Sequence, residues 1–180
     1  MKNVFLASAA VLMMAATPAL AQYGKKATTK ATTDQQFVTD VAHVGQAEVE
    51  LGKVAADKAS NDQVKKFGQR MADEHAKAGD ELKAAAEKSN MTWPAGLDPK
   101  HQALHDRLMK LSGEAFDRAY MQEMVAGHRA AVNEFKTESK TGKNPEIQAW
   151  ATKTLPTIEE HLKQAQEVSR GVVGTTGTKK

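Results

Sequence analysis

Three histidines and one glutamate stand out in this sequence because they interrupt the apolar stripes of long helical patterns. Apolar residues that recur at alternating steps of three and four predict the buried face of a helix. Glu48, His75 and His161 occupy such positions in three segments, and His128 lies in the best stripe of a fourth. A buried carboxylate is costly unless it is paired, hydrogen-bonded or bound to a metal. We therefore expect these four residues to meet in one layer of the core.

Such a layer has two interpretations. Neutral imidazole nitrogens and a carboxylate oxygen are common ligands of transition metals, so Glu48, His75, His128 and His161 are the predicted metal ligands. In the alternative, Glu48 accepts hydrogen bonds from the histidines, and a metal-free network fixes the register of the helices. The protein would then be a structural or interaction module of the cell envelope.

Two methionines bear on the identity of the metal. Met71 and Met124 precede His75 and His128 by four residues, which places sulfur and imidazole on one helix face. Sulfur with imidazole suits copper, whereas a carboxylate with three imidazoles suits zinc, iron or manganese. The sequence thus leaves Cu, Zn, Fe and Mn open, with Met71 and Met124 as additional candidate ligands. Packing of the core is the other interpretation of both methionines.

A binding protein is favoured over an enzyme, and no catalytic residue is assigned. A di-iron bundle needs Glu-x-x-His pairs, but Ala72, Val125 and Ile158 stand three residues before the three histidines. An oxidase would need more carboxylates than the stripes contain. The chain has no cysteine, which excludes thiolate chemistry and disulfides. We found neither a glycine-rich phosphate loop nor a convincing serine nucleophile.

The apolar stripes define four long helices and a short one. Their predicted ranges are residues 33–58, 60–89, 98–111, 114–140 and 145–170. Each of four starts carries a capping signal: Thr33 with Gln36, Ser60 with Gln63, Asp98 before Pro99, and Asn144 before Pro145. Gly171 is placed to end the last helix. Two tight turns and one longer crossover predict an all-α antiparallel four-helix bundle, with the short extra helix in the crossover between helices two and three.

Residues 1–21 have the pattern of a signal peptide. A basic start precedes an apolar run of about 13 residues, and Ala19-Leu20-Ala21 matches the small-x-small cleavage pattern before Gln22. Residues 22–32 and 171–180 are expected to be a disordered leader and tail, which leaves 33–170 as the bundle domain. The protein is therefore expected to be exported, to the periplasm or beyond the cell.

The rest of the composition argues against two classes of partner. No later run is long and apolar enough to span a membrane. The formal net charge is +3, and basic residues alternate with acidic ones, as on a solvated helix surface rather than a nucleic-acid patch. The sequence indicates no particular protein partner or oligomeric state.

Three segments carry a resemblance to a known family. The segments "AEVELGKVAADKASNDQVKKFGQRMADEH", "GEAFDRAYMQEMVAGH" and "TLPTIEEH" resemble domain-of-unknown-function family 4142, over about residues 33–168. Glu48, His75, His128 and His161 fall on its pattern. The resemblance implies an exported bacterial protein with a ferritin-like four-helix fold, although some members carry the label "outer membrane protein". It implies no reaction, so a role in metal or oxidative stress is our hypothesis from the predicted site and export.

Overall fold

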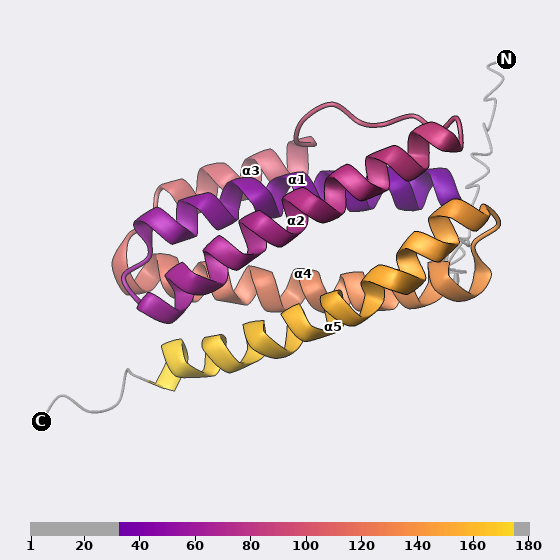
Figure 1. Ribbon diagram of the computed structural model, residues 1–180. Coiled ribbons are helices and arrows are strands. Elements are labelled where there is room, and N and C mark those ends of the chain that lie inside the picture. The colour runs from indigo at the N-terminus through magenta and orange to yellow at the C-terminus, as the bar shows by residue number, and fades with distance from the viewer. Residues whose placement is uncertain (1–32, 175–180) are drawn as a thin grey trace, which may run out of the picture. The chain divides into compact units, whose positions relative to one another are not determined.

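The computed structural model describes residues 33–174, which fold into five helices joined by short turns and one longer loop. The helices are α1 (Asp34–Lys58), α2 (Asp62–Lys88), α3 (Pro99–Met109), α4 (Gly113–Thr141) and α5 (Pro145–Gly174). Helices α1 and α2 form one antiparallel hairpin, and α4 and α5 form the other (Figure 1). The hairpins meet through α2 with α5 and through α1 with α4, while α3 packs on α1 and α4.

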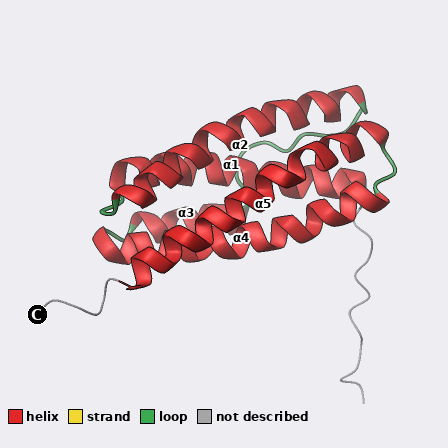
Figure 2. Ribbon diagram, turned by 60° about the horizontal axis from the view of Figure 1, so that its bottom comes forward, coloured by secondary structure: helices red, strands yellow, loops and turns green. Residues whose placement is uncertain are grey.

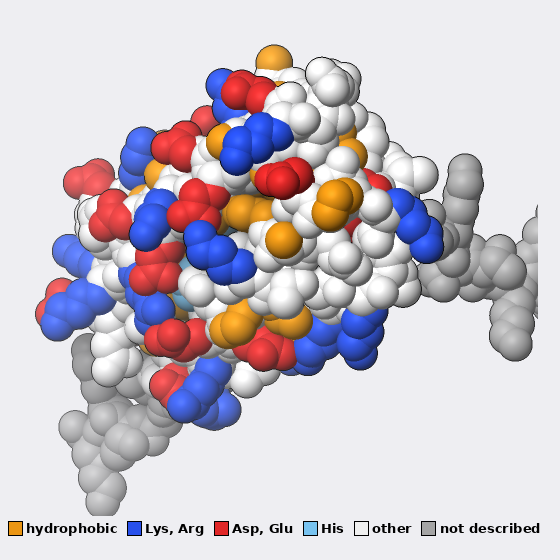
Figure 3. Space-filling view, turned by 45° about the vertical axis from the view of Figure 1, so that its right-hand side comes forward, with side chains coloured by type: hydrophobic (Ala, Val, Ile, Leu, Met, Phe, Trp, Pro, Cys, Tyr) orange, Lys and Arg blue, Asp and Glu red, His pale blue; other side chains and the backbone are white. Residues whose placement is uncertain are grey.

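The predicted fold is confirmed for the described residues. Figure 2 shows helices and loops only between residues 33 and 174, and α3 lies in the crossover from α2 to α4. The predicted signal peptide and leader, residues 1–32, lie outside the described residues. None of the described helices combines the length and the hydropathy needed to cross a membrane. Charged side chains of both signs are mixed over the face in Figure 3, as the alternating charges predicted.

Three of the four predicted helix caps are confirmed. The side chains of Thr33, Asp98 and Asn144 accept backbone N–H groups from the first turns of α1, α3 and α5. The prediction for α2 is wrong by one residue, because Asn61 and not Ser60 is the cap. The Asn61 side-chain oxygen accepts the N–H of the residue two positions on, at 2.8 Å.

Ser60 instead binds a carboxylate from the other hairpin. The buried side chain of Asp117 on α4 accepts the backbone N–H of Ser60 at 3.0 Å, the Ser60 hydroxyl, and the N–H of Asn61 at 2.9 Å. The first N–H groups of a helix lack partners within the helix, and its N-terminus favours negative charge. Asp117 therefore fastens the α1–α2 turn to α4.

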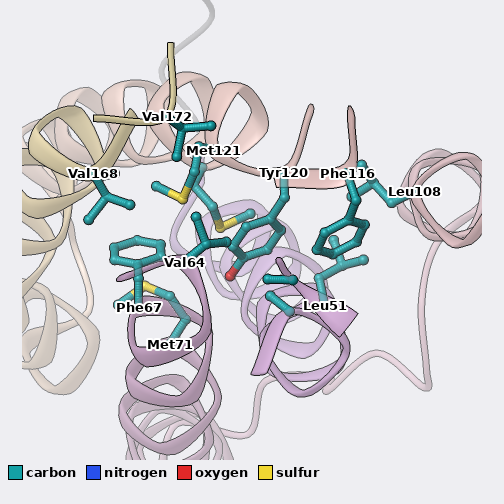
Figure 4. Packing of buried hydrophobic residues seen from close by; sticks show 14 residues of the cluster. Leu51, Val64, Phe67, Met71, Leu108, Phe116, Tyr120, Met121, Val168 and Val172 are labelled. Carbon is teal, nitrogen blue, oxygen red and sulfur yellow. The ribbon is translucent and has the colours of Figure 1, made fainter. Parts of the chain in front are cut away.

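The predicted end of α5 at Arg170 is wrong, because the helix continues to Gly174. Residues 171–174 of the predicted tail are thus helical. The reason is packing: the side chain of Val172 is 5% exposed and belongs to the same hydrophobic cluster as Val64 and Phe67 (Figure 4). Burial of this side chain favours continuation of the helix through Gly171.

Two hydrophobic clusters fill the bundle. The first lies toward the α1–α2 turn and includes Leu51, Phe67, Phe116, Tyr120 and Val168 (Figure 4). The second lies toward the α4–α5 turn and includes Phe37, Leu82, Phe135, Trp150 and Ile158. Tyr120 and Trp150 are core aromatics, with exposures of 0% and 7%.

Helices α1 and α2 approach each other through glycines. A Cβ atom at Gly52 would lie 2.6 Å from the carbonyl oxygen of Gly68 and 2.8 Å from the amide nitrogen of Ala72. A Cβ at Gly68 would lie 2.8 Å from the carbonyl oxygen of Gly52. These distances are shorter than van der Waals contact, so only glycine permits this spacing. Gly52 and Ala72 lie about one helical turn from Glu48 and His75, respectively, so the close approach fixes α1 against α2 beside them.

Candidate metal centre

Glu48, His75, His128 and His161 form a buried polar layer between the two hydrophobic clusters. Along each long helix, the core residues change from one cluster to the other at one of these four positions. Their side chains are almost inaccessible, with residue exposures of 5%, 8%, 1% and 1%. The structure therefore brings together the four residues that the apolar stripes singled out. Hydrophobic side chains exclude water above and below the layer.

The three histidines lie close enough to share one ion. Their ring centroids are 5.2 to 5.6 Å apart, and one nitrogen from each ring lies within 4.8 Å of the other two. Metal–nitrogen bonds of about 2.0 Å in a tetrahedral site separate the ligand atoms by about 3.4 Å. Inward shifts of roughly 1 Å by each ring would reach that geometry. Within residues 33–174, no other group of three such side chains meets this distance.

In two of the histidine rings, a hydrogen bond occupies one nitrogen and leaves the other without a partner. The Nδ1–H of His128 donates to the carbonyl oxygen of Met124 at 2.9 Å. The Nε2–H of His161 donates to Glu74 Oε2 at 2.6 Å, and Glu74 Oε1 accepts from Arg70 Nε at 2.7 Å. The other nitrogens, Nε2 of His128 and Nδ1 of His161, are buried and have no hydrogen-bond partner. A histidine that binds a metal typically donates its second N–H to a carbonyl or carboxylate in this way.

Glu48 contacts two of the histidines from the side. Its Oε2 lies 2.9 Å from His75 Nε2, and its Oε1 lies 3.5 Å from His128 Nδ1. The His75 contact is an ion pair when His75 is protonated, and His75 Nε2 has no hydrogen-bond partner. The close set of ligand atoms comprises the three histidines, and Glu48 places its negative charge beside them.

A model of the DUF4142 family, described as a domain of unknown function, matches residues 18–168. The chain belongs to this family. Two solved structures share the fold of this DUF4142 protein. The structure of CopM in the Cu(II)-bound form is 19% identical, with a TM-score of 0.64 over 77% of this chain and 97% of that one. A DUF305 protein from Streptomyces coelicolor, described as secreted, is 16% identical, with a TM-score of 0.65 over 83% and 99%. None of the curated proteins matches the chain.

The residues of the polar layer do not all carry the same charge in this DUF4142 protein. Burial alone would raise the pKa of Glu48, but the charges of His128, His75 and His161 and the contact with His75 together outweigh burial and lower that pKa to about 2. Burial is the largest single influence on the pKa of His75 and lowers it, but the contact with Glu48 and the charges of Glu48 and Glu74 together outweigh burial, so the net pKa is raised. For His161, burial dominates over the bond to Glu74 and lowers the pKa to about 4. Near neutral pH, Glu48 is therefore ionised and His161 is a neutral imidazole.

Both methionines that we considered as metal ligands lie in the hydrophobic cluster toward the α1–α2 turn of this DUF4142 protein. Met71 is 0% exposed and Met124 is 3% exposed, and both belong to the cluster that contains Phe67 and Tyr120 (Figure 4). This location fits the interpretation that both methionines pack the core. Met124 contributes to the layer through its backbone carbonyl, which holds His128.

Sequence reasoning assigned no firm role to Glu74 and Arg70. Their i, i+4 spacing on α2 predicts a pair on an exposed helix face. The structure shows that this pair reaches across to α5, where Glu74 binds His161 and Arg70 binds Gln164 at 2.9 Å. The signal available in the sequence was the pair of opposite charges at Arg70 and Glu74, which ends one residue before His75.

Proposed function

We propose that this protein binds one transition-metal ion in its core through His75, His128 and His161. One observation carries the proposal: each of these buried histidines has a ring nitrogen without a hydrogen-bond partner, and the rings converge. Buried polar atoms without partners are rare in folded proteins. A single ion would satisfy all three nitrogens at once, and the bonds to Met124 and Glu74 already hold two rings in the required tautomer.

Copper is the ion that this donor set favours. Imidazole suits copper and zinc, and divalent copper binds a given nitrogen site more strongly than zinc or other divalent ions of the first transition row. The shared fold with CopM, a protein solved in a Cu(II)-bound form, supports the same choice. In this proposal, Glu48 supplies a negative charge beside the ion, and Met71 and Met124 are not needed as ligands.

The proposed compartment is outside the cytoplasm. The signal-peptide pattern of residues 1–21, with cleavage between Ala21 and Gln22, supports export to the periplasm. Similarity of fold to a DUF305 protein described as secreted is in line with this. The protein would there hold a copper ion, with a role in metal or oxidative stress.

Titration of the mature chain without an affinity tag tests the proposal. Cu(II), Zn(II), Fe(II) and Mn(II) are added to the wild type and to His75→Ala, His128→Ala and His161→Ala. We expect one copper ion per chain in the wild type and affinity at least about 100-fold lower in each variant, because one of three ligands is lost. His105→Ala, at a partly exposed position on α3, is the control and should bind copper as the wild type does. Copper binding that survives all three core substitutions would overturn the proposal.

A metal-free network is the second candidate function. The 2.9 Å contact between Glu48 and His75 favours it, because it already pairs the buried carboxylate without an ion. The layer would then fix the register of the bundle in an envelope interaction module. Protein isolated from its native compartment would contain no stoichiometric metal, and added copper would leave its melting temperature unchanged.

A further inference from the structure

A cleft reaches the polar layer from one side of the bundle. Its volume is about 690 Å³, and residues of all five helices line it, chiefly those of α1 and α4. Glu48, His75 and His128 border the cleft. Helices α1 and α4 contact each other less closely than the two helices of either hairpin do, which leaves room for it.

The opposite side of the layer is closed by polar side chains. His161 does not border the cleft, and its Nε2 is bound to Glu74. Arg70 connects Glu74 to α5 through its bonds to Gln164 at 2.9 Å and Glu160 at 3.0 Å. An ion held by the three histidines would therefore be accessible from the α1–α4 side.

The size and lining of the cleft suit a small organic molecule. Binding sites for such molecules have volumes of about 300–1,000 Å³ and mostly apolar walls, whereas a water molecule occupies about 30 Å³. The apolar lining residues include Val41, Leu82, Trp93, Leu104, Phe135 and Ile158. A metal ion with one bound water would leave most of this space unfilled.

Three histidines leave an ion short of a full set of ligands, because copper and zinc sites take at least a fourth donor. We propose that the cleft binds a small uncharged molecule that has an apolar body and one nitrogen or oxygen donor. The donor completes the coordination of the ion, and the apolar body fills the cleft. This inference rests on the proposed function. The carboxylate of Glu48, which borders the cleft beside His75, disfavours an anionic donor there and can accept an N–H or O–H from the ligand.

Helical glycines allow the cleft to be blocked without disturbing the core. Gly45 and Gly79 line the cleft, and a Cβ at either position would meet no atom within 4 Å. Phenylalanine at these positions would therefore occupy the cleft. Gly171 offers a matched control, because it does not line the cleft and its Cβ would meet only the flexible Gln63 side chain, at 3.5 Å.

The test uses Cu(II)-loaded protein with imidazole and 4-phenylimidazole as probes, and electron paramagnetic resonance reports coordination to the metal. Both probes offer the same donor, and only the second has an apolar body. We expect 4-phenylimidazole to bind at least about tenfold more tightly, because its phenyl ring is buried in the cleft. Gly45→Phe and Gly79→Phe should each abolish this advantage while copper stays bound, and Gly171→Phe should retain it.

The outcomes separate this inference from the proposed function. Equal affinity for the two probes in a protein that binds copper would reject the cleft site alone. An advantage that persists in both cleft variants, with melting temperatures showing that they are folded, would also reject it. Absence of copper binding to the wild type would overturn the proposed function and the inference together.

Discussion

His161 Nε2 lies 2.6 Å from Glu74 Oε2, and this bond links the buried layer to the α2–α5 surface. The carboxylate accepts the Nε2–H, which leaves Nδ1 of this buried ring without a proton and without a hydrogen-bond partner. Glu74 also accepts from Arg70, which limits its motion.

Replacement of Glu74 by alanine should therefore weaken copper binding by about 10- to 100-fold, the usual effect of removing a carboxylate behind a metal-bound histidine. Isothermal titration with copper measures the change. Glu160→Ala is the matched control, because Glu160 also binds Arg70 but has no bond to His161. Equal losses of affinity in both variants would mean that the Arg70 network, and not the contact with His161, matters for binding.

Gly52→Ala should destabilise the bundle by about 1–3 kcal/mol, since the new methyl group would clash with the backbone of α2. Gly45→Ala should instead stabilise it by up to about 1 kcal/mol, because the added Cβ meets nothing and alanine favours helix. Urea denaturation of the metal-free proteins measures both. Similar effects of the two substitutions would contradict the close approach of α1 and α2.

Asp117→Ala should lower the free energy of unfolding by about 1–3 kcal/mol, because the N–H groups of Ser60 and Asn61 lose their acceptor. Asp57→Ala, at an exposed position on α1, should change it by less than about 0.5 kcal/mol. Chemical denaturation at neutral pH compares the two. A small effect of Asp117→Ala would show that water replaces the carboxylate at this turn.

Glu138 should make the stability of the protein fall as pH rises. Burial, a hydrogen bond to Asp34 and the charges of Asp34 and Glu134 raise its pKa from 4.5 to about 7. The folded state then binds more protons than the unfolded state between these values, so the free energy of unfolding decreases from pH 4.5 to pH 7. Glu138→Gln removes the contribution of Glu138 to this dependence, so the stability of the variant relative to the wild type should increase across that window.

Denaturation at intervals of half a pH unit measures this difference. Glu87→Gln, at an exposed position on α2, provides the baseline. A constant difference between Glu138→Gln and the wild type would show that Glu138 is not protonated in the folded state.

The sequence predicted the positions of the layer because helix periodicity is a local property. The steps of three and four that place Leu51 and Leu82 in the core place Glu48 and His75 there as well. The structure places Glu48 and His75 in one layer with the other two histidines, as we expected. Caps such as Thr33 are local for the same reason, since donor and acceptor lie within four residues.

Contacts between helices could not be predicted in this way. The bonds from Glu74 to His161 and from Asp117 to Ser60 join residues 87 and 57 positions apart. They depend on how each helix is rotated about its axis and on how far a side chain reaches. The extension of α5 to Gly174 likewise depends on a cluster that accepts Val172.

The sequence by itself determined the helices, their buried faces and the residues that interrupt those faces, because each is encoded within a few turns of one chain segment. Only the tertiary structure decided which ring nitrogens of the histidines are free, and that the Met124 carbonyl holds His128 while the Glu74 carboxylate holds His161. It also decided that a cleft lined chiefly by α1 and α4 borders the layer, because packing between the hairpins sets the distances between their helices.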